Sequence, residues 1–443
     1  MNFTLGTRLR NATVAMTCIG ALFLLFMANS APMGLKAPKY HQDRITQSVE
    51  GILHGRLLPR IGLTAWNDIK EIEGFAGQDD QGPRRLYIVN IAPYVHYAAA
   101  KALLPTRSIE RISRASDYIT VLATGALLLG VANEIFKNHQ HRLALSCSAY
   151  LLYVSSVWTY RAVLAPSKEF LMLPILLGAI LAETSKRRKT SCLLVAASSV
   201  VDYHWGFFIF LSYLPIYVRP VLGMSTKWSR EILPPSIRFN NTATQWCFCA
   251  LALTGSLVAV FHRFMVGQLG GGVTPSNSNA LYRVGIDSAS NIHYGGIIGP
   301  LQFLMGQRLN VCLQGARAGL DANIFVFNCG LTLASNALIA AASIAGITLL
   351  SRDVRIRWIL WPAIASFSMF ALLFPQSWAA HPGIYSYMFT PIFSVGIPAL
   401  AATVISRFCS SYRIPVMLTI YPSVIAGIVI NSIRTSFLTG PNA

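Results

Sequence analysis

Residues 117–136 read DYITVLATGALLLGVANEIF, and this apolar run is of the kind that decides the fold of the chain. As a helix, a run of about 20 residues rises about 30 Å, which is the thickness of the hydrocarbon core of a bilayer. Similar runs recur at Thr13–Ala28, Leu143–Trp158, Glu169–Ala182, Cys192–Val218, Trp246–Val266, Asn323–Leu350, Ile359–Phe374, Tyr385–Ile405 and Ile414–Ile430. The pattern predicts a helical protein that crosses a membrane many times.

The composition agrees with this interpretation. The 443 residues are 53% hydrophobic and 12% charged, and the mean hydropathy is +0.50. Soluble domains contain about 25% charged residues, so the composition excludes a soluble enzyme. We therefore expect an all-α fold, a transmembrane bundle of about 9–11 spans built as a single domain over residues 1–443.

The charge balance is strongly basic, with 36 Lys and Arg against 17 Asp and Glu and a net charge of +19. In a soluble chain such an excess would indicate a nucleic-acid partner. Here the basic residues lie in short tracts between apolar runs, where they determine topology, because Lys and Arg stay on the cytoplasmic side. We therefore expect membrane lipid, and no nucleic acid, as a partner.

Neither metal binding nor a cofactor is predicted. The eight cysteines are scattered, and Cys247 and Cys249 are too close together for the usual zinc spacing. Whether the chain requires a divalent metal stays open at this point.

The basic tracts also orient the chain. We expect an outer loop over residues 33–112 after the first apolar run, and the tyrosine-containing run 86–104 decides the topology of the later spans. If that run crossed the membrane, the tracts Lys137–Arg142 and Lys186–Lys189 would lie outside, against the positive-inside rule. The run is therefore predicted to lie along the outer leaflet as an interfacial helix, an arrangement that its Pro93 and tyrosines favour. Three arginines then lie outside and need a function, namely Arg107, Arg111 and Arg114.

One more crossing is required between residues 192 and 323. It falls either in the weak run Ile297–Met305 or at a break inside Cys192–Val218, which would rise about 40 Å if it were one helix. The sequence alone does not choose between these two positions.

Ionisable residues at membrane depth cost several kcal/mol unless they are paired or hydrated, so each is a functional candidate. Asp202 and His204 are the clearest pair. They either satisfy each other between helices or line a wet cavity that opens toward a charged lipid headgroup.

Cations at the outer mouth of the predicted spans form a second group of candidates. Arg161 and Lys168, the latter followed by Glu169, suit a phosphate or pyrophosphate, because Arg binds phosphate oxygens as a fork and Lys acts as a point charge. Arg111 and Arg114 join them under the predicted topology. The alternative is ordinary charge at a membrane boundary.

Two outer segments complete the set. Asp43 lies a short distance beyond the first span, where a carboxylate can accept a proton as a general base, although it is also a plausible solvated loop residue. A late segment contains His381, Tyr385 and Tyr387, aromatic side chains that suit stacking on a sugar or a place in the aromatic belt of a membrane protein.

This layout resembles the GT-C superfamily of integral-membrane glycosyltransferases. The resemblance is carried by Asp43 in an outer loop, an interfacial helix around Pro93, Arg111 at the mouth of the next span, Lys168-Glu169 opening a span that ends in Lys186–Lys189, and the late segment His381–Tyr387. It covers residues 10–215 and, more faintly, 375–405, and leaves 216–443 as a further helical part.

The resemblance implies transfer of a sugar from a polyprenyl-phosphate carrier to a lipid, glycan or protein acceptor at the outer or lumenal face. Asp43 would be the catalytic base, and Arg111, Arg161 and Lys168 would stabilise the leaving phosphate. The other substrate-binding candidates are Glu169, Asp202, His204, His381, Tyr385 and Tyr387. A bacterial inner membrane is favoured over the endoplasmic reticulum.

Two alternatives stay open. A polysaccharide polymerase of the Wzy kind also uses polyprenyl-linked sugars, and the segment Tyr160–Ala165 with His204 is similar to that group as well. A transporter of a lipid-linked or small polar solute would instead use Asp202 and His204 as a proton-coupled or substrate-binding pair.

Overall fold

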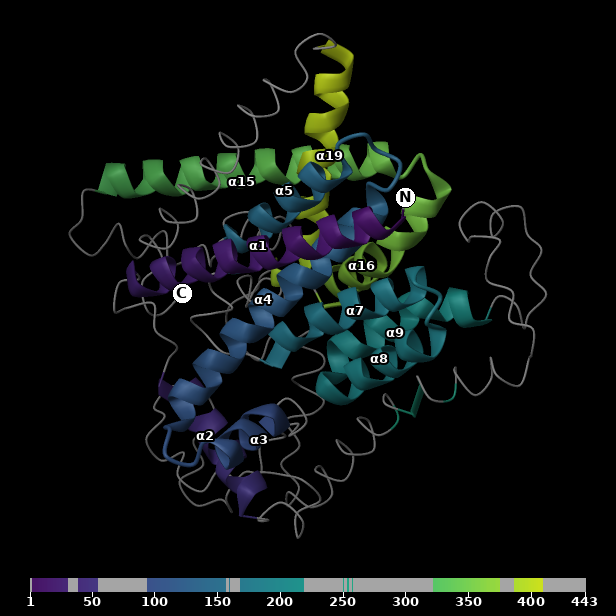
Figure 1. The fold of residues 1–443 in the computed structure, drawn as a ribbon. Coiled ribbons are helices and arrows are strands. Elements are labelled where there is room, and N and C mark those ends of the chain that lie inside the picture. Colours follow the sequence, from purple (N-terminus) through teal and green to yellow (C-terminus); the bar gives the residue numbers. More distant parts are fainter. Residues whose placement is uncertain are drawn as a thin grey trace.

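The computed structural model describes an all-helical chain and contains no strand in the part that it describes (Figure 1). That part comprises residues 2–30, 39–54, 94–156, 168–218, 322–374 and 386–408, with isolated positions at 159, 250, 253, 254 and 257. The helices in chain order are α1 (Asn2–Ser30), α2 (Lys39–Leu53), α3 (Val95–Leu103), α4 (Ile109–Ile135), α5 (Arg142–Val154), α7 (Met172–Thr184), α8 (Arg188–Val201), α9 (Tyr203–Val218), α15 (Ala322–Leu350), α16 (Val354–Leu373) and α19 (Thr390–Phe408), with short 3-10 turns η5 (Lys168–Leu171) and η6 (Ser386–Phe389).

Four segments of the described chain are helical, long and apolar enough to cross a membrane: Thr7–Leu25, Ile109–Ile135, Val354–Leu373 and Tyr387–Val404. Shorter apolar helices are Arg142–Val154, Met172–Thr184, Trp205–Pro215 and Ala337–Leu350. The helical class and a membrane-embedded character therefore agree with the sequence analysis. The larger number of spans, the outer loop and the single domain stay predictions.

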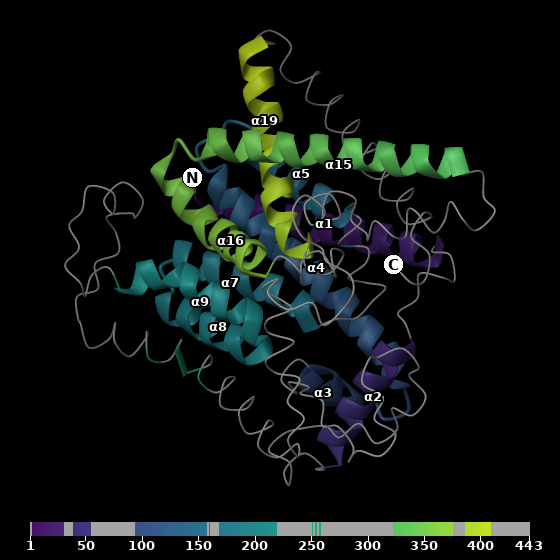
Figure 2. The same ribbon diagram turned by 180° about the vertical axis from the view of Figure 1, so that it is seen from behind.

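The predicted run Cys192–Val218 is divided into two helices. α8 ends at Val201 and α9 begins at Tyr203, and the two helices lie side by side (Figures 1 and 2). At the corner a side chain on Gly206 would overlap the backbone of Ser199, so this close approach requires glycine. Of the two positions considered for the additional crossing, the run Cys192–Val218 is interrupted at Asp202, and Ile297–Met305 lies outside the described residues. The crossing itself stays a prediction.

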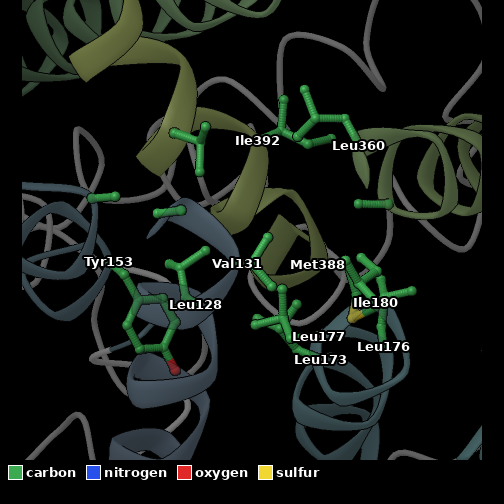
Figure 3. Packing of buried hydrophobic residues seen from close by; sticks show 14 of the residues in the cluster. Leu128, Val131, Tyr153, Leu173, Leu176, Leu177, Ile180, Leu360, Met388 and Ile392 are labelled. Carbon is green, nitrogen blue, oxygen red and sulfur yellow. The ribbon is translucent and has the colours of Figure 1, made fainter. Parts of the chain in front are cut away.

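The core forms where α4, α5, α7, α16 and the η6–α19 segment meet. Tyr150 shows how closely they pack: its ring lies between α1 and α4 and occupies the space that side chains on Gly20 and Gly125 would fill. Figure 3 shows further buried side chains from these elements, among them Leu128, Val131, Tyr153, Leu173, Leu176, Leu177, Ile180, Leu360, Met388 and Ile392.

Basic side chains cap the C-terminus of α4. The guanidinium of Arg355, at the start of α16, donates to the carbonyl oxygens of Glu134 at 2.7 Å and Ile135 at 3.2 Å. Arg142 donates to the carbonyl oxygen of Asn133 at 2.8 Å. Positive charge at this position satisfies exposed carbonyls and complements the helix dipole.

The third basic tract lies near the same end of α4. α7 packs against α4 so that Leu181, one turn before the end of α7, contacts Gly130 near the end of α4. The Lys186–Lys189 turn comes directly after α7. The tracts at 137–142, 186–189 and 352–357 thus gather at one end of the bundle, which we call the basic end. A shared end is what the prediction that the tracts at 137–142 and 186–189 lie on one side of a membrane requires.

α15 and α19 cross at two glycines (Figures 1 and 2). A side chain on Gly346 would overlap the carbonyl of Gly396, and one on Gly396 would overlap the carbonyl of Ser343. Small residues let helix backbones approach this closely, and such contacts stabilise helix pairs in membranes, where apolar burial gives little driving force.

We predict that Gly396→Ala lowers the unfolding free energy by about 1–3 kcal/mol, because the added methyl group forces the crossing apart. Gly178→Ala is the matched control: it is also within a helix, and its Cβ would approach only the end of the Leu194 side chain, at 3.3 Å. The control should change the free energy by less than about 1 kcal/mol. Chemical or thermal unfolding of the detergent-purified variants measures both, and equal stability of the two variants would contradict the crossing.

Candidate functional site

A small apolar cluster joins α2, α3 and the start of α4 at the end opposite the basic end. Ile45 and Val49 of α2 pack with Tyr97 and Ala98 of α3 and with Ile109 of α4. The buried side of α2 therefore faces α3 and α4. The first residues of α4 pack against α2, which follows α1 in the chain. We call this cluster, with the buried side chains directly beneath it, the α2–α3–α4 junction.

Asp117 lies in this junction, two turns into α4, and is only 5% exposed. Its Oδ1 accepts a hydrogen bond from the hydroxyl of Tyr97, and its Oδ2 has no hydrogen-bond partner among the described residues. Removing a carboxylate from water is costly unless donors replace the water, so a half-satisfied carboxylate at this depth is a marker of function.

Tyr97 is suited to act as the donor. Burial, and in addition the charge of Asp117, raise the pKa of Tyr97 well above its ordinary value. The phenol therefore keeps its proton throughout the physiological pH range and remains a donor to the carboxylate.

A pair of buried tyrosines lies beyond Asp117, deeper in the bundle. The hydroxyls of Tyr153 on α5 and Tyr387 in η6 are 2.6 Å apart. The Tyr153 hydroxyl is also 3.1 Å from the carbonyl oxygen of Val121, to which it can donate, so either phenol can supply the proton between the two tyrosines. Phe170 of η5 packs edge-on against Tyr387, with ring centroids 5.1 Å apart.

These contacts bring distant segments of the chain to the first half of α4. Tyr387 of η6 is joined to α4 through Tyr153, whose hydroxyl is within hydrogen-bond distance of the carbonyl oxygen of Val121. Through Phe170, η5 adjoins Tyr387, and through Ile45 and Val49, α2 adjoins α4. The predicted outer segment around residue 43 therefore packs on the start of α4. The segments around residues 168 and 387 adjoin each other and are joined to α4 through Tyr153.

The individual predicted residues are distributed over several elements. Asp43 lies in α2, Lys168 and Glu169 in η5 and His204 in the first turn of α9, but their side chains are outside the described set. Arg111 is exposed in the first turn of α4, where its backbone N–H donates to the N-cap Ser108. Arg161, His381 and Tyr385 lie outside the described residues.

Asp202 has a clear local role. It ends α8, with its N–H donating to the carbonyl of Ser198, and it begins α9 as an N-cap, with Oδ1 accepting from the N–H of Trp205 at 3.3 Å. The residue is 1% exposed. An N-cap carboxylate accepts from a backbone N–H that has no partner within the helix, and its charge complements the positive end of the helix dipole. The N-terminus of α9 therefore stabilises the negative charge of Asp202.

Asp117 was not among the site residues predicted from sequence. It is the first residue of the apolar run quoted above, and the sequence analysis assigns it no role. The signal that points to it is that Ser113, Asp117, Val121 and Thr124 succeed one another at helical spacing, and all four are buried. Its partner Tyr97 comes from the predicted interfacial run. Among the described residues no group of three His, Cys, Asp or Glu lies together as a metal site would require.

Comparison with models of protein families and with curated proteins found no match to this chain.

We predict that Tyr97→Phe destabilises the chain by about 1–3 kcal/mol, because the buried Asp117 carboxylate loses its donor. Asp117→Leu should also destabilise it, by leaving the Tyr97 hydroxyl without its acceptor. The double variant Tyr97→Phe/Asp117→Leu should lose less unfolding free energy than the two single variants lose together, since neither buried polar group then remains without a partner. Thermal unfolding of the purified variants measures the coupling, and strictly additive losses would show that the pair does not interact.

Proposed function

We propose that the chain is an integral-membrane glycosyltransferase that transfers a sugar from a polyprenyl-phosphate donor to a lipid, glycan or protein acceptor. The observation that supports this most is the packing around the first half of α4. α2, which contains Asp43, packs on the start of α4, while η5, which contains Lys168 and Glu169, adjoins Tyr387 of η6, and Tyr387 is joined to α4 through Tyr153. The resemblance in layout to the GT-C superfamily supports the same conclusion.

The proposed reaction requires a base and a cationic site. The acceptor hydroxyl attacks the anomeric carbon, the bond from that carbon to the phosphate oxygen breaks, and the carrier phosphate leaves with the electron pair. Asp43 takes the proton of the attacking hydroxyl. Arg111, Arg161 and Lys168 bind the leaving phosphate, because charge develops there in the transition state. Tyr385, Tyr387 and His381 belong to the segment proposed to contact the sugar or its carrier.

The proposed topology is set by the basic tracts. The basic end faces the cytosol of a bacterial cell, and the α2–α3–α4 junction faces the opposite side of the inner membrane. The complete bundle has about 9–11 spans in one domain, with α3 as an interfacial helix within the outer loop. The four candidate spans of the described chain are part of that number.

A transporter is the second candidate, and one observation favours it. Asp117 is a buried carboxylate within a candidate span, as in proteins that bind a proton or a polar solute inside the membrane. A transporter would move an intact substrate across the bilayer, whereas the proposed enzyme consumes its donor. The fate of the polyprenyl-linked sugar therefore distinguishes the two.

We predict that Asp43→Asn lowers sugar transfer at least about 100-fold, because the amide cannot accept the proton of the attacking hydroxyl. The assay measures labelled sugar transferred from a polyprenyl-phosphate donor in membranes that contain the variant. Glu50→Gln is the matched control, since Glu50 is a partly exposed acidic residue on the same helix, paired with His54 at 3.1 Å. It should retain transfer.

Three results would contradict the assignment. Transfer at the wild-type rate in Asp43→Asn would remove the proposed base. Reporter fusions that place position 43 in the cytosol would rule out the proposed topology. Joining of preassembled repeat units, in place of single sugars, would indicate a polymerase of the Wzy kind.

A further inference from the structure

The turn between α3 and α4 presents a pair of leucines on its outside. One side of α3 is buried through Tyr97 and Ala98, while Leu103 is 81% exposed and Leu104 is 53% exposed. Large apolar side chains with this exposure normally contact another protein or lipid. We call residues 101–114, which contain these leucines, the α3–α4 corner.

Cations surround the leucines of the α3–α4 corner. Lys101 folds onto the turn, where its Nζ donates to the carbonyl oxygens of Pro105 and Arg107 at 2.7 Å each. Arg114 forms an ion pair with Glu110 at 2.6 Å. Glu110 is the single acidic residue in this stretch, against four basic ones.

Two of these cations are available for a partner. Arg107 and Arg111 are exposed, and neither makes an ion pair with any residue that the structure describes. Arginine that is neither paired nor buried suits a phosphate group, which it binds through two parallel hydrogen bonds.

The exposed side chains of α4 change from charged to apolar along the helix, in the order found at a membrane interface. Arg111 is exposed in the first turn, and Ile119, about 12 Å further along the axis, is 65% exposed. Arginines level with headgroups and apolar side chains level with acyl chains are the usual arrangement at this boundary.

We propose that the α3–α4 corner docks on the membrane surface and binds anionic phospholipid headgroups of the bilayer. Leu103 and Leu104 enter the boundary between headgroups and acyl chains. Arg107 binds a headgroup phosphate, and so does Arg111 whenever no carrier phosphate is bound to it. Lipid negative charge attracts basic residues at the surface, and the exposed leucines keep the corner at that depth. Binding of this kind explains why basic residues lie on the side where the positive-inside rule disfavours them.

The test uses the full chain in nanodiscs and requires no carrier lipid, so its outcome is independent of the proposed glycosyltransferase activity. Leu103→Trp introduces an indole at the corner, and its fluorescence is obtained as the difference from the chain without this substitution. The probes are two sets of nanodiscs, each with phosphatidylcholine and phosphatidylglycerol at equal mole fraction. In one set the acyl chains of phosphatidylcholine are brominated, and in the other those of phosphatidylglycerol.

The expected result is that brominated phosphatidylglycerol quenches the introduced indole about twofold more than brominated phosphatidylcholine. Adding Arg107→Gln and Arg111→Gln should abolish the difference, while Arg107→Lys with Arg111→Lys should retain most of it. Arg352→Gln, which removes an exposed cation at the basic end, is the control and should leave the difference unchanged.

Two outcomes would overturn the proposal. Equal quenching by the two brominated lipids in the Leu103→Trp chain would show that the corner has no preference for anionic headgroups. No quenching by either lipid would show that the corner lies in water. Because all the substituted side chains are exposed, a gel-filtration profile like that of the parent confirms that each variant is folded before its quenching is measured.

Discussion

The ends of helices are the constraint on which the rest of this structure depends. Inside apolar surroundings a helix satisfies its own backbone groups, except for the first N–H and the last C=O groups. The chain supplies partners for these groups from elsewhere in the molecule. Arg142 and Arg355 donate to the last carbonyls of α4, and Asp202 and Asp353 accept from the first N–H groups of α9 and α16.

These caps also connect the elements. Arg355 begins α16, so capping α4 fixes where α16 starts, and the neighbouring Asp353 holds the first turn of that helix. Trp361 of α16 in turn donates to the carbonyl of Ser212 in α9, at 2.9 Å. These bonds join α16 to both α4 and α9.

Different polar groups join the helices toward the opposite end of α4. There the contacts are tyrosine hydroxyls and a carboxylate, with Tyr97 on Asp117 and Tyr387 on Tyr153. The second of these bonds joins residues 234 positions apart in the chain, on α5 and η6. A hydroxyl is a smaller desolvation cost than a charge, so tyrosines allow a polar site to be held together at a depth where ion pairs would be expensive.

The helical class, the membrane-embedded character and the grouping of basic tracts could all be predicted from the sequence, because they depend on composition and on the order of apolar and charged stretches. The sequence also indicated Tyr387 and the segment before it as candidates for a site. It did not reveal the partners of Asp117 or the role of Asp202 as a cap. The cap depends on the α8–α9 corner, where Gly206 allows close contact with Ser199, and the partner of Asp117 depends on where α3 meets α4. A pattern along one helix does not encode the position of its neighbour, so the tertiary structure was needed to place a buried carboxylate beside a tyrosine of another helix.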